Sequence, residues 1–75
     1  MKEQKGKKIK EIILKNMNKA IEETGLSRQK IAEELGVDYS TVWRLLKGQK
    51  NIKPEYIAEI AYLTYRTPND FFYVK

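Results

Sequence analysis

Residues 27–50, SRQKIAEELGVDYSTVWRLLKGQK, decide the fold of this chain. They contain two short amphipathic runs, RQKIAEEL and YSTVWRLLK, which are separated only by Gly36-Val37-Asp38. A linker this short cannot lay two helices side by side, so we expect the helices to cross at a large angle. That arrangement is typical of a helix-turn-helix, in which the second helix is presented to a groove of DNA.

Several positions carry the side chains that such a turn requires. Ala32 is small on the inward face of the first run, where a bulkier residue would push the second helix away. Gly36 can adopt the positive φ that a helix end needs before a sharp turn. Asp38 lies where an N-cap is expected, with an oxygen able to accept from the exposed amides of the next turn. Val42 and Leu45 are three positions apart in the second run and should face the helix formed by the first run, RQKIAEEL.

This stretch resembles the DNA-binding domain of the lambda-type repressor and Cro family, also called the XRE-like regulators. The family pattern of alanine, glycine four positions later and a β-branched residue six further on is met by Ala32, Gly36 and Val42. The resemblance extends over about residues 9–72 through later family elements, namely Lys47, Gly48, Lys50, Pro54 and Ile60-Ala61.

The chain departs from the family pattern at two places. Arg28 stands where the family often has glutamine, with Gln29 next. Thr64 and Arg66 stand where aliphatic core residues are usual. We therefore expect the aromatic residues nearby to fill that corner, namely Tyr65, Phe71 and Phe72.

Composition restricts the classes of function. The 75 residues suffice for one small domain and include neither cysteine nor histidine, so thiolate ligands, disulfides and the usual near-neutral general base are missing. The acids are expected on solvated helix faces, so we expect no enzyme activity and no cofactor, metal or small-molecule ligand. Without a membrane-length apolar run or a signal-peptide core, the expected location is the cytoplasm of a bacterial or phage-infected cell.

Positive charge is concentrated in two parts of the sequence. Residues 1–10 contain five lysines against Glu3, which gives +4 of the total +5. A second cluster, Arg44, Lys47, Lys50 and Lys53, has no acid between its members. Segregated positive charge is typical of a polyanion binder, although a basic surface also simply improves solubility. The second cluster lies in and just after the second helix of the helix-turn-helix, and this position favours polyanion binding over improved solubility.

The order of elements predicts an all-α, compact five-helix domain like that of lambda repressor. Residues 1–8 lack periodicity and are expected to form a flexible basic arm, which either wraps the duplex or is a solvated tail. The domain follows over residues 9–75, with the helix-turn-helix at about 27–47. The first helix is expected at about 9–23, and its apolar stripe comprises Ile9, Ile12, Ile13, Met17, Ala20 and Ile21. Further helices are expected at about 28–35, 39–46, 54–64 and 67–72.

With Val42 and Leu45 buried, the outward face of the third helix comprises Tyr39, Ser40, Trp43, Arg44 and Lys47. We predict base contacts from the first four, since Arg44 can donate two parallel hydrogen bonds to guanine and Ser40 can donate or accept. Tyr39 and Trp43 offer apolar edges for thymine methyl groups or sugars. Trp43 has two alternatives, which are to cover a gap beside Leu46 or to anchor a protein partner.

Phosphate contacts are expected on both sides of this helix. The start of the second helix exposes amides and a partial positive charge, next to Ser27, Arg28 and Gln29. The alternative for Arg28 is a plain surface charge. The loop after the third helix supplies the other predicted contacts, which are Lys47, Gln49, Lys50 and Asn51.

These observations predict a sequence-specific double-stranded DNA-binding regulator of transcription. The resemblance implies a phage, prophage or mobile-element repressor of Cro/repressor type, which acts as a homodimer on a palindromic operator. Excess aromatic residues near the end of the chain also suggest self-association, namely Tyr62, Tyr65, Phe71, Phe72 and Tyr73. The alternative is a protein-interaction module on the same fold, of antitoxin or anti-repressor type.

Overall fold

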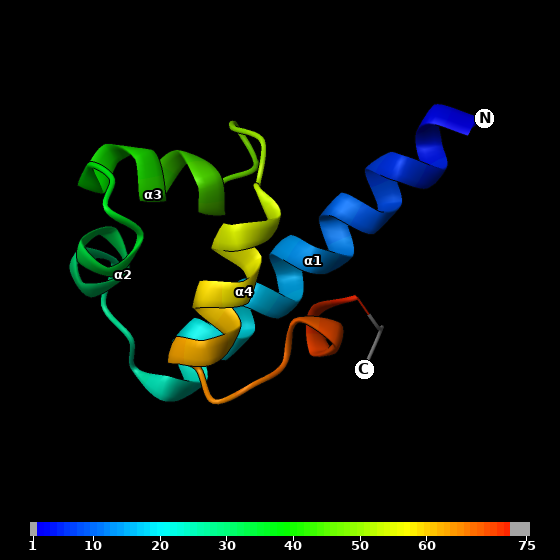
Figure 1. Ribbon diagram of the computed structural model, residues 1–75. Helices are drawn as coiled ribbons and strands as arrows, with labels where there is room; N and C mark the ends of the chain where they lie inside the picture. The colour runs from blue at the N-terminus through cyan, green and yellow to red at the C-terminus, as the bar shows by residue number, and fades with distance from the viewer. Residues whose placement is uncertain (1, 73–75) are drawn as a thin grey trace.

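The computed structural model describes the backbone of residues 2–72 and the side chains of residues 8–72. Within that range the chain is all-helical: α1 (Lys2–Thr24), α2 (Arg28–Leu35), α3 (Tyr39–Leu46) and α4 (Pro54–Leu63) are followed by a single 3-10 turn, η1 (Pro68–Phe71) (Figure 1). The all-α class is confirmed. The prediction of five helices is wrong, because the four residues of η1 are too few for an α-helix and form one tighter turn instead.

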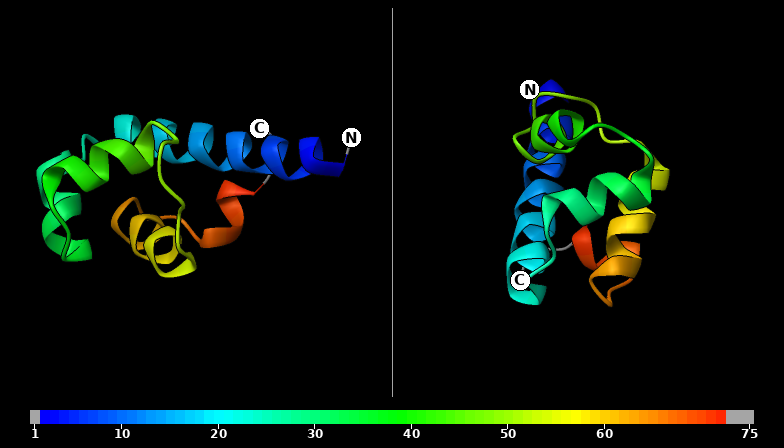
Figure 2. Two further views of the ribbon diagram at one scale, coloured as in Figure 1. Left: turned by 90° about the horizontal axis from the view of Figure 1, so that it is seen from above. Right: turned by 90° about the vertical axis from the view of Figure 1, so that its left-hand side faces the viewer.

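Helix α1 is longer than its apolar pattern predicts. It begins at Lys2 rather than at Ile9, so the expected arm at residues 1–8 is helical from Lys2 onward. Lysine, glutamate and glutamine have high helix propensity, and the single Gly6 costs only about 1 kcal/mol. The first turns project beyond the rest of the molecule (Figures 1 and 2). Ile9 lies on this projecting part and is exposed, so its predicted place in the core is wrong.

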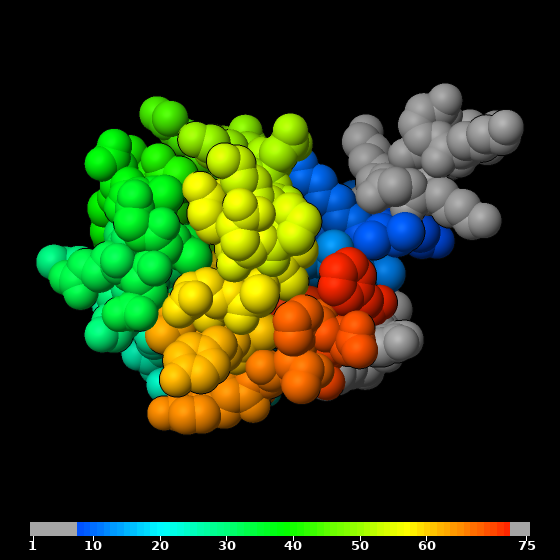
Figure 3. Space-filling model, in the orientation of Figure 1, coloured from blue at the N-terminus to red at the C-terminus, as the bar shows by residue number. Residues whose placement is uncertain are grey.

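The core lies where α1 packs with the other helices. Helix α1 contributes Ile13, Met17 and Ala20, and α2 contributes Ile31 and Ala32. The remaining buried apolar residues come from α3, α4 and η1, namely Val42, Leu45, Leu46, Ile57, Ile60, Ala61 and Phe71. Helix α4 and the C-terminal segment cover one face of this core (Figure 3). Because α2 and α3 each bury only one side, their other sides remain available for binding.

The corner after α4 is built differently from the expected aromatic filling. Phe71 is buried there as predicted, but Tyr65 is 91% exposed and Phe72 is also exposed. Thr64 is completely buried, and its Oγ1 donates to the carbonyl of Ile60 at 2.8 Å. This internal hydrogen bond satisfies the hydroxyl, so a threonine replaces the usual aliphatic residue without leaving a polar atom unpaired.

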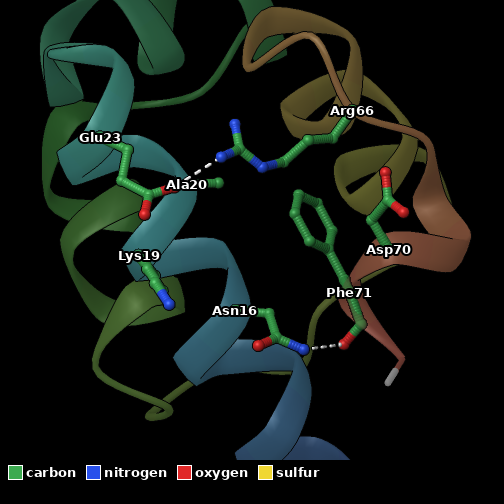
Figure 4. Close-up of a pocket in the computed structure, with 7 residues that line it drawn as sticks. All are labelled: Asn16, Lys19, Ala20, Glu23, Arg66, Asp70 and Phe71. Atoms are coloured by element: carbon green, nitrogen blue, oxygen red, sulfur yellow. Dashed lines mark hydrogen bonds and ion pairs between the residues drawn. The ribbon is translucent and has the colours of Figure 1, made fainter. Parts of the chain in front are cut away.

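Arg66 connects this corner to α1. Its Nη2 donates to Oε1 of Glu23 at 2.6 Å (Figure 4). Its Nη1 donates to the carbonyl of Thr64 at 2.7 Å. Asn16 of α1 also donates from Nδ2 to the carbonyl of Phe71 at 2.9 Å (Figure 4). The bond from Asn16 joins η1 to α1, and the bond from Arg66 to Glu23 joins the segment before η1 to α1. Both lie on the side of the molecule away from α3 (Figure 1).

Candidate nucleic-acid interface

The turn between α2 and α3 has the predicted backbone geometry. Gly36 adopts the left-handed conformation, with φ 69° and ψ 34°, and its N–H donates to the carbonyl of Ala32. Val37 also donates to the carbonyl of Ala32, at 3.1 Å. The chain therefore reverses within residues 36–38, and Figure 1 shows α2 almost end-on while α3 runs across the view. This crossing is the helix-turn-helix arrangement that the short linker predicts.

The two helices begin with different kinds of cap. Ser27 is extended, and its Oγ accepts from the N–H of Lys30 at 3.1 Å, as predicted. Asp38 occupies the N-cap position of α3, but its side chain makes no capping hydrogen bond. That part of the prediction is wrong. The backbone carbonyl of Asp38 alone starts the helix, accepting from Thr41 at 3.0 Å and from Val42 at 3.3 Å, and the carboxylate is left in solvent.

Helix α3 is strongly two-sided. Val42, Leu45 and Leu46 are buried against the other helices. The opposite side presents all four residues predicted to contact bases: Tyr39 is 54% and Trp43 is 42% exposed, and Ser40 and Arg44 are exposed as well. Together with Gln49, these four residues line one hollow of about 450 Å³ on the surface. The burial of one side therefore fixes the orientation of the other.

Trp43 is held in place by a neighbouring cation. The Nζ of Lys47 lies 4.8 Å from the centre of the Trp43 ring, within the range of a cation–π contact. Lysine and tryptophan at this spacing lie on adjacent turns of one helix face. The indole is therefore presented at the surface with a positive charge beside it, a combination that suits a negatively charged partner.

The end of α3 and the start of the following loop lie close to α1, and two hydrogen bonds from α1 reach them. Gly48 has φ 79°, and a Cβ there would lie 3.0 Å from Cδ1 of Leu14. The Nζ of Lys10 donates to the carbonyl of Gly48 at 3.3 Å. Asn18 donates from Nδ2 to the carbonyl of Leu46 at 3.2 Å, and to that of Leu14 at 2.8 Å. The loop residues predicted to contact phosphate thus follow a point at which the chain is hydrogen-bonded to α1.

The residues predicted to contact phosphate lie on both sides of α3. All of them are exposed: Ser27, Arg28 and Gln29 at the start of α2, and Lys47, Gln49, Lys50 and Asn51 at the end of α3 and in the following loop. None of these seven residues is acidic. One refinement concerns Gln49, which lines the same hollow as the predicted base-contacting residues.

Sequence reasoning missed a second concave surface next to this one. A groove runs between α1, the start of α2 and the start of α3, and its lining includes Lys15, Lys19, Glu22, Arg28 and Tyr39. Tyr39 lines both this groove and the hollow over α3, so the two surfaces adjoin at this residue. The α1 lysines are far from α3 in sequence, and no local motif marks them.

The described residues contain no group of three or more acidic side chains placed to hold a metal ion. Among the same residues, no helix is both long enough and apolar enough to cross a membrane.

A family model described as bacterial toxin YdaS matches residues 17–67 of the chain. The chain belongs to this family. The matched range contains all of α2, α3 and α4, so the helix-turn-helix lies within the part that defines the family. No curated protein and no solved structure gave a significant match. Membership is compatible with a helix-turn-helix protein, and the family description names a toxin rather than a repressor.

Proposed function

We propose that this chain binds double-stranded DNA sequence-specifically and regulates transcription, as a phage, prophage or mobile-element protein of Cro/repressor type. Helix α3 would enter the major groove and present Tyr39, Ser40, Trp43 and Arg44 to base edges. The observation that carries the proposal is the two-sided burial of α3, which leaves these four side chains exposed on a helix whose other face is packed in the core. Such a helix can be inserted into a groove without unfolding anything.

The charge distribution supports the same partner. Arg28, Arg44, Lys47 and Lys50 are exposed around α3, and none of them forms an ion pair within the described residues. Exposed cations without ion-pair partners are typical of a surface that binds phosphates and releases counterions.

Selection of bound sites from a pool of random duplexes tests the proposal. We expect an enriched motif of two related half-sites, whose centres lie about 34 Å apart if the protein binds as a dimer. The affinity for the selected site should fall steeply as the salt concentration rises. Enrichment of no motif, with equal binding to all duplexes, would contradict sequence-specific recognition.

The family description names a bacterial toxin, so the proposed function must also account for harm to a cell. We propose that toxicity, where the chain causes it, follows from occupation of host DNA rather than from catalysis, since the sequence contains neither histidine nor cysteine. The growth rate of cells that express the chain measures the toxicity. Arg44→Ala should relieve the growth defect at an unchanged protein level, whereas a defect that persists when DNA binding is lost would contradict it.

A protein-interaction module, of antitoxin or anti-repressor type, is the second candidate. The exposure of Trp43 and Tyr39 favours it, because partly exposed aromatic residues are common anchors of protein interfaces. Its signature would be weak DNA binding that changes little with salt. The salt titration of the selected duplex therefore separates the two candidates.

A further inference from the structure

We infer that the groove between α1 and the start of α2 holds the sugar–phosphate backbone of the duplex, with Lys15 and Lys19 as additional phosphate-contacting residues. This inference rests on the proposed function. It extends the DNA-binding surface from the helix-turn-helix onto α1, which the sequence motif does not include.

The charges in the groove are the first argument. Its lining includes three cationic side chains, Lys15, Lys19 and Arg28, against the single carboxylate of Glu22. All four residues are exposed. A concave surface in which cations outnumber acids concentrates the positive potential and attracts a polyanion.

The two α1 lysines have no partner within the part of the chain that the structure describes. Helical spacing places Glu23 one turn after Lys19, but Glu23 pairs with Arg66 at 2.6 Å instead (Figure 4). Lys15 and Lys19 are themselves four residues apart, so their like charges repel along the helix. A phosphate placed near both ammonium groups would remove that repulsion.

The position of the groove is the second argument. Tyr39, the first residue of α3, lines both the groove and the hollow formed with Ser40, Trp43 and Arg44. The groove also includes Ser27 and Arg28, which precede and begin α2. A duplex whose major groove receives α3 must place a backbone on either side of that helix. Lys50 lies in the loop that follows the C-terminal end of α3, and this groove meets α3 at its N-terminal end.

The test is the salt dependence of binding to the selected duplex by the full chain and by Lys15→Gln/Lys19→Gln. Glutamine keeps the helix propensity of α1 and removes only the charges. Loss of two phosphate contacts should reduce the slope of log K against log salt by about 1.8, so that wild-type affinity falls about 12-fold more than the variant's over a fourfold rise in salt. The ranking of different duplex sequences should not change.

Two controls separate a local contact from a change in net charge. Lys15→Arg/Lys19→Arg keeps both charges and should retain the wild-type slope. Lys30→Gln removes one charge from a lysine outside the groove that pairs with Glu34 at 3.3 Å. It should change the slope less than Lys15→Gln does.

Removal of the one acid in the groove, Glu22, should change the affinity for DNA in the opposite direction. Glu22→Gln should tighten binding to all duplexes several-fold, because the carboxylate lies in the groove beside the phosphates. Glu33→Gln makes the same change at an exposed residue outside the groove and should have a smaller effect.

Ethylation interference locates the contacts on the DNA. Ethylation of certain phosphates should block binding of the wild-type protein. At some of these phosphates, ethylation should no longer affect binding of Lys15→Gln/Lys19→Gln. An unchanged slope together with an unchanged interference pattern would overturn the inference while leaving recognition by α3 intact. Equal binding of the wild-type chain to all duplexes would contradict the proposed function but not the groove, and no binding to any duplex would overturn both.

Discussion

At the scale of single residues, the side chains that we propose to contact bases and those that we propose to contact phosphates differ in their position around α3, apart from Gln49. Arg44 lines the hollow over α3, whereas Lys50 lies in the loop beyond it and does not. Arg44→Ala should therefore reduce discrimination between the selected operator and one altered at a single guanine by about 1–3 kcal/mol. Lys50→Ala should weaken all duplexes alike and reduce the salt slope by about 0.9. Competition binding with matched duplexes measures both, and an equal loss of affinity for all sequences in Arg44→Ala would argue against base recognition.

Two glycines with similar backbone angles should respond differently to substitution. Gly36 has φ 69° with nothing within 4 Å of an added Cβ, so Gly36→Ala should cost only the strain of a left-handed residue, about 1–2 kcal/mol. Gly48 has φ 79° and would also bring its Cβ to 3.0 Å from Cδ1 of Leu14. Gly48→Ala should thus lower the free energy of unfolding more than Gly36→Ala. Urea denaturation gives both values, and equal losses would mean that the Leu14 side chain moves away at no cost.

At the scale of the helix, the two caps of the helix-turn-helix make different predictions. Ser27→Ala removes the hydrogen bond from the N–H of Lys30 and should destabilise the protein by about 1 kcal/mol. Asp38→Ala removes no capping bond, so its cost should remain within about 0.5 kcal/mol. The midpoints of urea unfolding test this pair. A larger loss for Asp38→Ala than for Ser27→Ala would show that the carboxylate caps α3 in solution.

The same elements show why helix positions were largely predictable. The bounds of α2 and the start of α4 depend on local signals, namely Ser27, Gly36 and Pro54, whose chemistry acts within a few residues. The start of α1 precedes the apolar stripe, in a segment whose lysine, glutamate and glutamine favour a helix by propensity, so no apolar periodicity marks it. The residue type of Asp38 predicts a side-chain cap, but in the structure the backbone carbonyl alone starts α3.

At the scale of the whole molecule, the candidate site was predictable only where one segment supplies it. The exposed face of α3 follows from the spacing of Val42 and Leu45 within a single helix. The groove with Lys15 and Lys19 arises where α1 meets α2 and α3, and no pattern within one segment encodes that meeting. The corner after α4 likewise depends on Arg66 reaching Glu23, which is 43 residues earlier in the chain.

The proposed homodimer makes a prediction at this scale, at the end of α4. Tyr62 is 76% and Tyr65 is 91% exposed, and both line a surface hollow with Leu63 and Arg66. Tyr65 also has φ 62°, a conformation that costs a non-glycine residue roughly 1 kcal/mol. A large apolar side chain held in strain and in solvent contributes little to folding of the monomer, so we propose that it serves contact with a second copy.

Substitution of Tyr65 should therefore change stability and association in opposite directions. Tyr65→Gly relieves the backbone strain and should raise the free energy of unfolding of the monomer by up to about 1 kcal/mol, while it weakens the dimer. Tyr62→Ser, within helical backbone, should weaken the dimer without any such gain. Sedimentation equilibrium measures association, and urea unfolding at low protein concentration measures monomer stability. If both variants associate as the wild type does, the two copies must meet through another surface, because no dimer that buries these rings could tolerate the loss of either.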